Sequence, residues 1–510
     1  MRVKDFLTIG KIEEAHGHFE REVKGLTYDS RQAQEGWIFF ALPGVNADGH
    51  AYVTAALAQG ASAAVVERAE AVPEGATWIR VANTRRTLGL WSAAFYGHPS
   101  EQLPLIGVTG TNGKTTVTYL VESILRAAGL EPGVIGTVNY RYRDRVLPSH
   151  HTTPEACELQ ELLAGMRAAG ARSAVMEVSS HALAQDRVRG LEFDVGVFTN
   201  LSRDHLDYHR DMDDYFSAKA KLFNDHLARS SKKKKAAVIY GPDPRGQTLL
   251  QQVRNLGLES WSYGPEEQWD VHAVDIESDV AGLRGKIQVK DEQFEFSSAL
   301  VGAANLQNIL GAAGVGFALG LPPAKIIDGI HQLKVVPGRL QKVEQSLDIS
   351  ILVDYAHSPD ALEKVLGAVR PLTRGRVITV FGCGGDRDRG KRPVMGEIAG
   401  RLSDIAVLTS DNPRTEDPLA ILAEVEGGIQ KTPMKKFSVG GAESRGTQRG
   451  YYVESDRRAA IRIALGVARP GDVVLIAGKG HEDYQILGKK KINFDDCEVA
   501  REEAAQRAGA

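Results

Sequence analysis

Short apolar runs alternate with longer amphipathic stretches along most of the 510-residue chain. In the first hundred residues, the helical stretch AYVTAALAQGA (51–61) separates the apolar runs WIFFAL (37–42) and AAVVE (63–67). A second series begins at LIGVTG and continues with ARSAVMEVSS, FDVGVFTNL and KKAAVIYG (105–110, 171–180, 193–201 and 234–241). This alternation predicts parallel sheets covered by helices on both faces.

A third series follows KVVPGRLQKVE, and each of its apolar runs ends in a polar or glycine-containing segment. The runs are ISILVDYAH, RVITVFGCGGDRD, DIAVLTSDNPR and DVVLIAGKGHEDYQ (349–357, 376–388, 404–414 and 472–485). Ligands bind α/β sheets at the carboxyl ends of the strands, so these endings are candidate binding loops. The length and the two breaks predict three α/β domains: a smaller N-terminal domain (1–100), a central parallel-sheet domain with a phosphate loop (101–335) and a Rossmann-like C-terminal domain (336–510).

Composition and charge exclude several classes of protein. A net charge of −3 argues against a general nucleic-acid binder, and three widely spaced cysteines favour a reducing cytoplasm over a disulfide framework. The N-terminus lacks a long apolar core, and the most apolar stretch, ILGAAGVGFALGLPP, is too short and glycine-rich to span a membrane, so it predicts a buried helix. The basic run SSKKKK (230–235) is typical of a solvated turn.

The stretch TGTNGKTT (109–116) lies between the apolar run LIGV and the amphipathic stretch TVTYLVESILRAAG. The usual phosphate-loop spacing would require a glycine where Val108 stands. Strand, glycine-rich turn and helix N-terminus nevertheless supply the backbone N–H groups and the dipole that hold phosphate oxygens, which favours a nucleotide site over an incidental turn. Lys114 would reach the β and γ phosphates, and Thr115 or Thr116 would ligate Mg²⁺.

Further motifs follow in order, and together with GTNGKTT they resemble those of the Mur ligase family, the ATP-dependent enzymes that extend the cell-wall precursor peptide. They are MEVSSHAL, FTNLSRDHLDYH, SAKAKLF, GAANLQN, PGR, DYAHSPDAL, GGDRDRGKRP, DNPR and GKGHEDYQ, preceded by TYDSR and NADGH. The resemblance covers essentially the whole chain. It implies a ligase in which a substrate carboxylate attacks the γ phosphorus of ATP and an amine then displaces phosphate from the acyl phosphate.

The resemblance assigns residues to ATP and metal. It implies a catalytic set of Lys114, Glu177, His205 and Lys219, and metal ligation by Thr115, Glu177, His205 and Lys219, the last as a carbamate formed with CO₂. Taken singly, Glu177, His205 and Lys219 are better explained as a strand-end Glu, a turn His and an exposed helix Lys, since most such residues are structural or solvated. ATP contacts are expected from Gly110, Thr111, Asn112, Gly113, Lys114, Thr115 and Thr116, with Asn308 at the adenine and Arg339 and Asp354 at the phosphate and ribose.

At the nucleotide-sugar end, the resemblance implies binding of UDP-N-acetylmuramoyl-L-alanyl-D-glutamate. Arg187 suits a carboxylate, because its guanidinium forms paired hydrogen bonds. His151 departs from the pattern, which has Asn there, and Ala304 stands where a bulkier residue is usual. The implied contacts are Tyr28, Ser30, Val45, Asn46, Ala47, His151, Thr152, Thr153, Ser179, Gln185 and Arg187.

At the amine end, DNPR resembles the branch of the family that adds meso-2,6-diaminopimelate, and L-lysine is the alternative amine. Recognition of a second amino-carboxyl centre needs cations and hydrogen-bonding groups together. The expected residues are Arg387, Asp411, Asn412, Pro413, Arg414, Gly478 and Glu482. A phosphate-loop kinase or ATPase would use residues 107–116 without needing this end. A folylpolyglutamate synthetase would lack DNPR and TYDSR. We expect small-molecule substrates, no nucleic acid, no membrane insertion and a monomer.

Overall fold

The structure is a computed structural model that describes residues 1–44, 47–438 and 448–509. Contacts divide the chain into two compact units. Unit 1 comprises Met1–His272 and Leu310–Gly329, and unit 2 comprises Ala273–Ile309 and Ile330–Ala510.

Unit 1 begins with a five-stranded sheet in the order β1-β5-β4-β3-β2, parallel except for β1 against β5. Alternate residues of β3 face opposite sides: Phe40 packs with Trp91, whereas Phe39 packs with the second helix. The strands are β1 (Ile12–His16), β2 (Gly25–Thr27), β3 (Trp37–Phe40), β4 (Ala63–Val66) and β5 (Trp78–Val81), and the helices are α1 (Val3–Phe6), α2 (Val53–Ala58) and α3 (Thr84–Phe95).

Within unit 1, the strands β6 to β13 of a larger sheet run in the order β13-β12-β11-β6-β10-β7-β8-β9. Strands from β13 to β7 are parallel, and β8 and β9 add an antiparallel hairpin. Its strands are β6 (Leu105–Thr109), β7 (Pro132–Ile135), β8 (Asn139–Tyr142), β9 (Arg145–Pro148), β10 (Ser173–Glu177), β11 (Val195–Phe198), β12 (Ala236–Tyr240) and β13 (Glu259–Tyr263).

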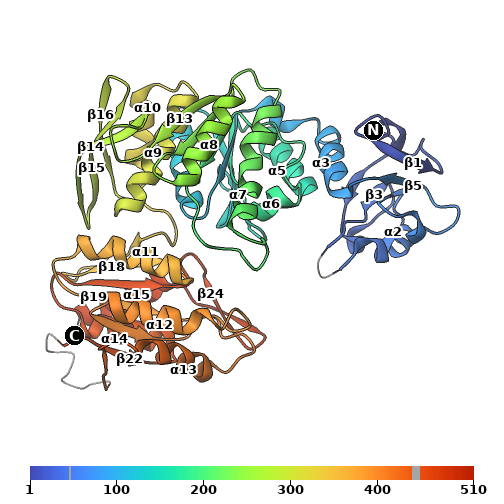
Figure 1. The fold of residues 1–510 in the computed structure, drawn as a ribbon. Helices are drawn as coiled ribbons and strands as arrows, with labels where there is room; N and C mark the ends of the chain where they lie inside the picture. Colours follow the sequence, from blue (N-terminus) through green and yellow to red (C-terminus); the bar gives the residue numbers. More distant parts are fainter. Residues whose placement is uncertain (45–46, 439–447, 510) are drawn as a thin grey trace. The chain divides into compact units, whose positions relative to one another are not determined.

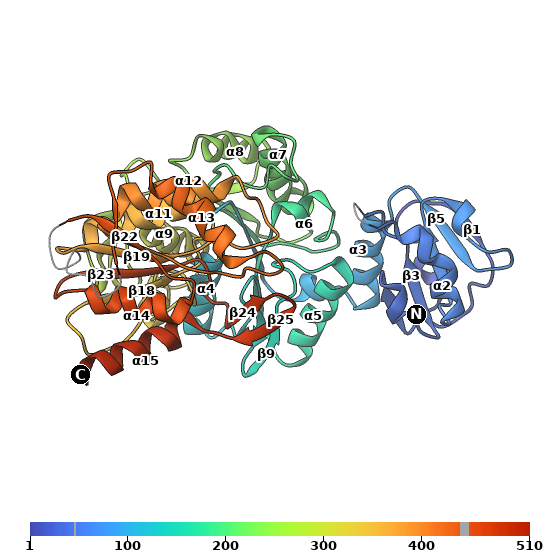
Figure 2. The same cartoon turned by 90° about the horizontal axis from the view of Figure 1, so that it is seen from below.

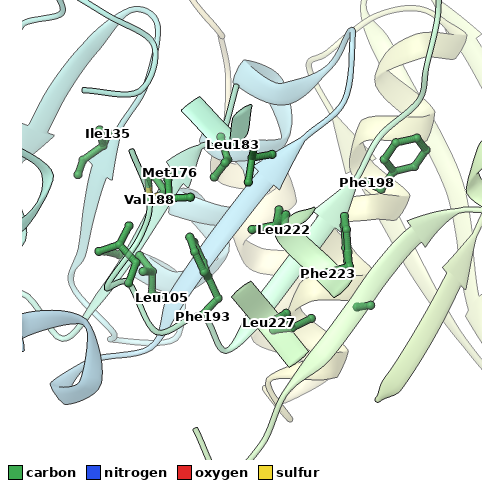
Figure 3. Packing of buried hydrophobic residues seen from close by; sticks show 14 of the residues in the cluster. Leu105, Ile135, Met176, Leu183, Val188, Phe193, Phe198, Leu222, Phe223 and Leu227 are labelled. Carbon is green, nitrogen blue, oxygen red and sulfur yellow. The ribbon is translucent and has the colours of Figure 1, made fainter. Parts of the chain in front are cut away.

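Helices cover this sheet and bury its nearly continuous apolar strands, as parallel sheets require. Figure 3 shows part of the core, where Leu105 and Phe193 lie near Leu222, Phe223 and Leu227. The helices are α4 (Lys114–Ala127), α5 (Ala156–Ala168), α6 (Ser180–Ala184), α7 (Met212–Lys221) with a π-helical continuation (Leu222–Leu227), and α8 (Pro244–Asn255); α9 (Ala303–Ala318) and α10 (Pro323–Gln332) are divided between the two units.

Unit 2 contains a seven-stranded sheet in the order β17-β18-β23-β19-β20-β22-β21, parallel except for β17. Helices α11, α12 and α13 cover one face and α14 and α15 the other (Figures 1 and 2). The strands are β17 (Gln341–Lys342), β18 (Ser350–Asp354), β19 (Val377–Phe381), β20 (Ile405–Leu408), β21 (Lys435–Lys436), β22 (Gly450–Val453) and β23 (Val473–Ala477).

The helices of unit 2 are α11 (Pro359–Val369), α12 (Lys391–Leu402), α13 (Pro418–Ile429), α14 (Arg457–Val467) and α15 (Asp496–Ala508). Two antiparallel elements complete the unit: β15 (Gly282–Val289) with β16 (Glu292–Ser298), preceded by β14 (Val271–Asp279), and the hairpin of β24 (Tyr484–Leu487) with β25 (Lys490–Asn493).

Each quoted apolar run forms a strand, and the apolar stretch predicted as a buried helix forms most of α9. The predicted α/β class is confirmed, although the hairpins of β8–β9 and β14–β16 make the sheets mixed. No helix within the described ranges combines the length and apolarity needed to cross a membrane. The predicted boundaries of the three domains stay a prediction, because the contacts within the chain divide it into two units and not three.

Candidate active site

The loop between β6 and α4 has the conformation that its glycines permit. Gly110 has φ 143° and Gly113 has φ 86°, in the region that side chains rarely adopt, and a Cβ at Gly110 would lie 1.9 Å from Thr199 Oγ1. The Asn112 backbone N–H donates to Asn200 Oδ1 at 3.0 Å, and Thr199 Oγ1 donates to the Asn112 carbonyl at 2.6 Å. The segment after β11 thus fixes the loop, and α4 begins at Lys114 with its N-terminus toward it.

Two lysines lie against the same carbonyl oxygen of this loop. Lys114 Nζ donates to the Gly110 carbonyl at 2.9 Å, and Lys219 Nζ donates to it at 2.8 Å. Lys219 is 1% exposed, contrary to the exposed helix lysine that its sequence position alone would suggest, and it lies 4.4 Å from the ring centroid of Tyr215. Burial first, and then the charge of Lys114, hold the pKa of Lys219 well below its ordinary value, which favours the neutral form of its amine.

Glu177, at the end of β10, is held on the other side of the loop. Thr115 Oγ1 donates to Glu177 Oε2 at 3.1 Å. Thr137 donates twice: its backbone N–H to Oε1 at 2.8 Å and its hydroxyl to Oε2 at 3.0 Å. A Cβ at Gly136 would lie 2.6 Å from Oε1, so this chain segment closes around the carboxylate. Thr137 was not among the predicted site residues; its position after the apolar run that forms β7 was the available signal.

His205 lies in the turn after β11 with φ 54°, a left-handed backbone unusual for His. Its ring lies 5.0 Å from that of His181 and 5.9 Å from that of Tyr215, the ring that Lys219 also contacts. Desolvation and the charges of Lys114 and Lys219 lower the pKa of His205, against the charge of Asp204. Glu177 is thus hydrogen-bonded to Thr115, whereas His205 and Lys219 both contact the ring of Tyr215.

The oxygen atoms of the side chains at this loop fit Mg²⁺, which prefers oxygen ligands. A carboxylate and a hydroxyl lie together at Glu177 and Thr115. Within the described residues, no three His, Cys, Asp or Glu side chains form a metal-binding group. A Mg²⁺ ion at Glu177 would therefore complete its coordination with phosphate oxygens and water.

The residues predicted for the muramoyl-peptide end surround the end of β10. Thr153 Oγ1 donates to the Glu177 carbonyl at 2.8 Å and accepts from the Ser179 backbone N–H at 3.0 Å. Thr152 Oγ1 lies 3.1 Å from Thr137 Oγ1. Thr153 thus bonds the backbone carbonyl of Glu177, and Thr152 lies beside Thr137, which donates to the Glu177 carboxylate.

Arg187 is already paired within the protein. Its guanidinium lies 3.0 Å from Glu155, donates to Gln185 Oε1 at 2.8 and 3.1 Å, and donates to the Thr153 carbonyl at 3.1 Å. Arg85, from α3, donates to the same Glu155 at 3.0 Å. A substrate carboxylate that binds Arg187 would therefore either displace the carboxylate of Glu155 or bind beside it.

The remaining nucleotide-sugar candidates are spread over the first 151 residues. Tyr28 and His151 line a cavity of about 680 Å³ beside α5 and the β8–β9 hairpin, a size suited to a small ligand. The Tyr28 hydroxyl donates to Glu158 at 2.9 Å. Ser30 begins a 3₁₀ turn, and Ala47 is exposed. Val45 and Asn46 lie outside the described residues.

In unit 2, the predicted ATP contacts comprise one helix residue and two residues near β18. Asn308, in α9, donates to Asn305 at 3.1 Å. Asp354, at the end of β18, accepts from the backbone N–H groups of Leu340 and Ala356 at 2.8 and 2.9 Å. Desolvation raises the pKa of Asp354, and the charge of Arg339 opposes that shift.

The amine-end residues meet at the ends of β19, β20 and β23. Asn412 Nδ2 donates to Glu482 Oε2 at 2.9 Å, and Arg414 donates to the Gly385 carbonyl at 2.7 Å. Gly478 has φ 120°, and a Cβ there would lie 2.6 Å from Asp411 Oδ2, so a side chain would displace Asp411. The structure therefore brings together four of the predicted residues: Asp411, Asn412, Gly478 and Glu482.

Two other predicted residues frame this group. Pro413 lies between Asn412 and Arg414, and its carbonyl approaches Gly385 so closely that a Cβ there would be 1.9 Å away. Arg387 is exposed, and within the part of the chain that the structure describes its side chain donates only to the carbonyl of its neighbour Asp386, at 3.1 Å. Arginines thus lie on both the loop after β19 and the loop after β20.

Fold and site define a phosphate-loop α/β protein in which Lys114 and the buried Lys219 donate to one loop carbonyl, with a cluster of polar side chains at the strand ends of a second sheet. Family models agree: the Mur ligase middle domain matches residues 108–316, the "Mur ligase, glutamate ligase domain" matches 338–480, and the "Mur ligase family, catalytic domain" matches 22–96. The chain therefore belongs to the Mur ligase family, and the predicted enzyme class, a ligase, is confirmed.

Similar proteins cover nearly the whole chain. A Geobacter metallireducens protein named UDP-N-acetylmuramoyl-L-alanyl-D-glutamate–2,6-diaminopimelate ligase is 50% identical over 98% of this chain and 97% of its own. A Thermosynechococcus vestitus protein of the same name is 45% identical over 99% and 98%. A solved structure of a ligase with that name is 32% identical, covers 100% and 99%, and has a TM-score of 0.72. A Mycobacterium tuberculosis folylpolyglutamate synthase, 17% identical, covers 83% and 95% with a TM-score of 0.60 and shares the fold alone.

Proposed function

We propose that this protein is an ATP-dependent amide ligase that joins meso-2,6-diaminopimelate to UDP-N-acetylmuramoyl-L-alanyl-D-glutamate in peptidoglycan precursor synthesis. The geometric observation that carries the chemistry is the phosphate loop whose Thr115 is hydrogen-bonded to the buried Glu177, with Lys114 alongside. The substrate assignment is supported by the shared name of relatives that match this chain over nearly its full length.

The reaction has two steps. An oxygen of the substrate carboxylate attacks the γ phosphorus of ATP, the bond from that phosphorus to the bridging oxygen breaks, and an acyl phosphate and ADP form. The neutral amine then attacks the acyl carbon, phosphate leaves, and a proton is lost to water. Catalysis of phosphoryl transfer is largely positioning and charge neutralisation, and Lys114 on the phosphate loop supplies a cation for it.

Mg²⁺ bound at Glu177 and Thr115 would offset the negative charge of the phosphates. Lys219 is proposed to react through its neutral amine with CO₂, forming an N–C bond and releasing a proton. The low pKa of this amine supports that role, because only the neutral form is a nucleophile. The product is a carbamate anion, which suits a place beside Lys114 better than a second ammonium does.

At the amine end, Arg414 and Arg387 are proposed to bind the distal carboxylate of diaminopimelate, and Glu482 with Asn412 its ammonium. Glu482 already accepts from Asn412 and from Lys479, at 2.9 and 3.2 Å, so the carboxylate is oriented before a substrate arrives. L-lysine, the alternative amine, lacks the carboxylate that would occupy the arginines.

We expect the enzyme to act as a monomer in the cytoplasm. The three cysteines, Cys157, Cys383 and Cys497, are buried and unpaired in the structure, as a reducing compartment allows.

The test is ADP release by the purified protein. A ligase of this kind should form ADP over many turnovers only when UDP-N-acetylmuramoyl-L-alanyl-D-glutamate and meso-diaminopimelate are both present, with the tripeptide product identified by mass spectrometry. Steady ADP formation without the amine would indicate an ATPase or kinase instead.

A further inference from the structure

The motif GGDRDRGKRP (384–393) contains three arginines, and the predicted substrate contacts give no role to the third, Arg392. It lies in the first turn of α12, and its side chain is 0% exposed. The guanidinium donates to both oxygens of Glu416, at 2.7 and 2.9 Å, and to Glu424 at 2.9 Å. It also donates to the Gly384 carbonyl at 3.2 Å. A buried cation with these partners is a cross-link between segments, since unpaired arginines are rarely buried.

Glu416 extends this cross-link to the loop after β19. Its Oε1 accepts from the backbone N–H of Asp386 at 2.5 Å. Next to it, the Gly385 N–H donates to the Asn412 carbonyl at 2.9 Å. The loop 384–387, which carries one predicted substrate arginine, is therefore attached to the loop 411–416, which carries the other.

Both loops contain backbone that needs support. Asp386 has φ 53° and Arg414 has φ 52°, a region in which L residues persist only when their surroundings hold them. The Asp386 carboxylate accepts from the Thr415 N–H at 3.1 Å and from its hydroxyl at 2.8 Å. Arg414 donates across to the Gly385 carbonyl at 2.7 Å. Each strained residue is thus hydrogen-bonded to the opposite loop, and the backbone of Arg414 is also bonded to Ile486 and Gly488 of the β24–β25 hairpin, at 3.1 and 2.7 Å.

We propose that Arg392 is a positioning residue for amine selection: by fixing the loop 384–387 to the loop 411–416, it sets the separation at which Arg387 and Arg414 meet the distal carboxylate of the amine. This inference rests on the proposed function and names a determinant of its specificity. Arg392 itself touches no substrate, because its guanidinium is buried against Glu416 and Glu424.

The charge state of the cross-link supports this role. The pKa of Glu416 is lowered to about 2, first by the hydrogen bonds from Arg392 and then by the backbone of Asp386. The link is thus an ion pair throughout the neutral range.

Two variants weaken the cross-link in different ways. Arg392→Lys keeps the charge but loses the two-pronged geometry, and Glu416→Gln removes the ion pair while keeping the side-chain shape. We expect both to raise KM for meso-diaminopimelate about 10- to 100-fold, because small displacements of positioning groups have effects of this order. KM for ATP and for the nucleotide peptide should not change.

Arg389→Ala is the matched control, because Arg389 donates to the same Glu424 from an exposed position and, within the described residues, makes no hydrogen bond to Glu416. It should leave all three KM values unchanged. In an Arg414→Ala background, Arg392→Lys should add little, since residues acting through one contact are not additive. Thermal unfolding of each variant shows whether it is folded. If the Arg392→Lys variant is not folded, the KM values of Glu416→Gln decide the test.

The inference is overturned if the folded variants keep the wild-type KM for the amine. It is also overturned if they change all three KM values alike, or if Arg392→Lys and Arg414→Ala are fully additive. If the wild-type protein does not use meso-diaminopimelate at all, the proposed function fails instead, which a single wild-type assay distinguishes.

Discussion

The phosphate loop of unit 1 and the amine-end loops of unit 2 both lie at the carboxyl ends of parallel strands, but they are held differently. The phosphate loop is one contiguous segment fixed mainly by glycine conformations and by the chain around Asn200. Lys114 and, from α7, Lys219 donate to its Gly110 carbonyl. The amine-end loops follow three strands and are tied by ion pairs of two buried arginines, Arg392 with the partly exposed Glu416 and Arg457 with the buried Asp496.

Because of this difference, we expect substitutions at the phosphate loop to change turnover and substitutions at the amine-end loops to change amine selectivity. Cations at the phosphate loop are proposed to act on the transferring phosphoryl group, so their loss should reduce turnover with any amine. Side chains at the amine end contact only the incoming amino acid in the proposed function, so their loss should alter selectivity while ATP binding persists. Variants at the two places should therefore change different kinetic constants.

Lys219→Ala should have the largest effect, nearly abolishing ligation with meso-diaminopimelate or any other amine. The proposed carbamate anion would be missing, and short carboxylic acids added to the assay should restore part of the rate by supplying an anion in the vacated space. The measurement is kcat with and without added acetate. A fully active Ala variant would rule out the carbamate.

Lys114→Ala should follow, because it removes a cation held at the phosphate loop. We expect kcat/KM to fall on the order of a hundredfold or more, as for removal of one preorganised charge-stabilising donor. The loss should be equal for every accepted amine. An unchanged rate would mean that residues 107–116 do not serve the reacting nucleotide.

Thr137→Val should have a smaller effect, since it removes one of the two hydrogen bonds that Thr137 donates to Glu177 and leaves the backbone one. Hydrogen bonds to charged groups contribute about 1.5–3 kcal/mol, which corresponds to roughly a tenfold to hundredfold loss. The concentration of Mg²⁺ needed for half-maximal rate should rise, and binding of Mn²⁺ with ADP, followed by electron paramagnetic resonance, should weaken. Thr137→Ser retains the hydroxyl and should behave like wild type; equal loss in both variants would argue against this hydrogen bond.

Much of the fold was predictable from sequence, because buried parallel strands such as β6 and β23 read as continuous apolar runs. The hairpin β8–β9 was missed, because Arg145–Pro148 is exposed and alternates little. At the site, the contiguous loop around Lys114 could be located from its motif, and the resemblance assigned Lys219. Neither the motif nor the family resemblance indicated that Lys219 is buried beside Lys114, or that Glu155 forms an ion pair with Arg187. Such long-range contacts depend on packing between segments that no local pattern relates.

The proposed amine specificity is tested most directly by kcat/KM for meso-diaminopimelate and for L-lysine, measured with the wild type and with Arg414→Ala. Lysine presents the same reacting amine but leaves Arg414 and Arg387 without a carboxylate, and leaving a charged group unpaired costs about 2–5 kcal/mol, or roughly 30-fold to several thousandfold. The wild type should prefer meso-diaminopimelate by that ratio, and Arg414→Ala should lose most of the preference while KM for ATP is unchanged. A wild type that prefers L-lysine would contradict the specificity assignment and leave the ligase chemistry standing.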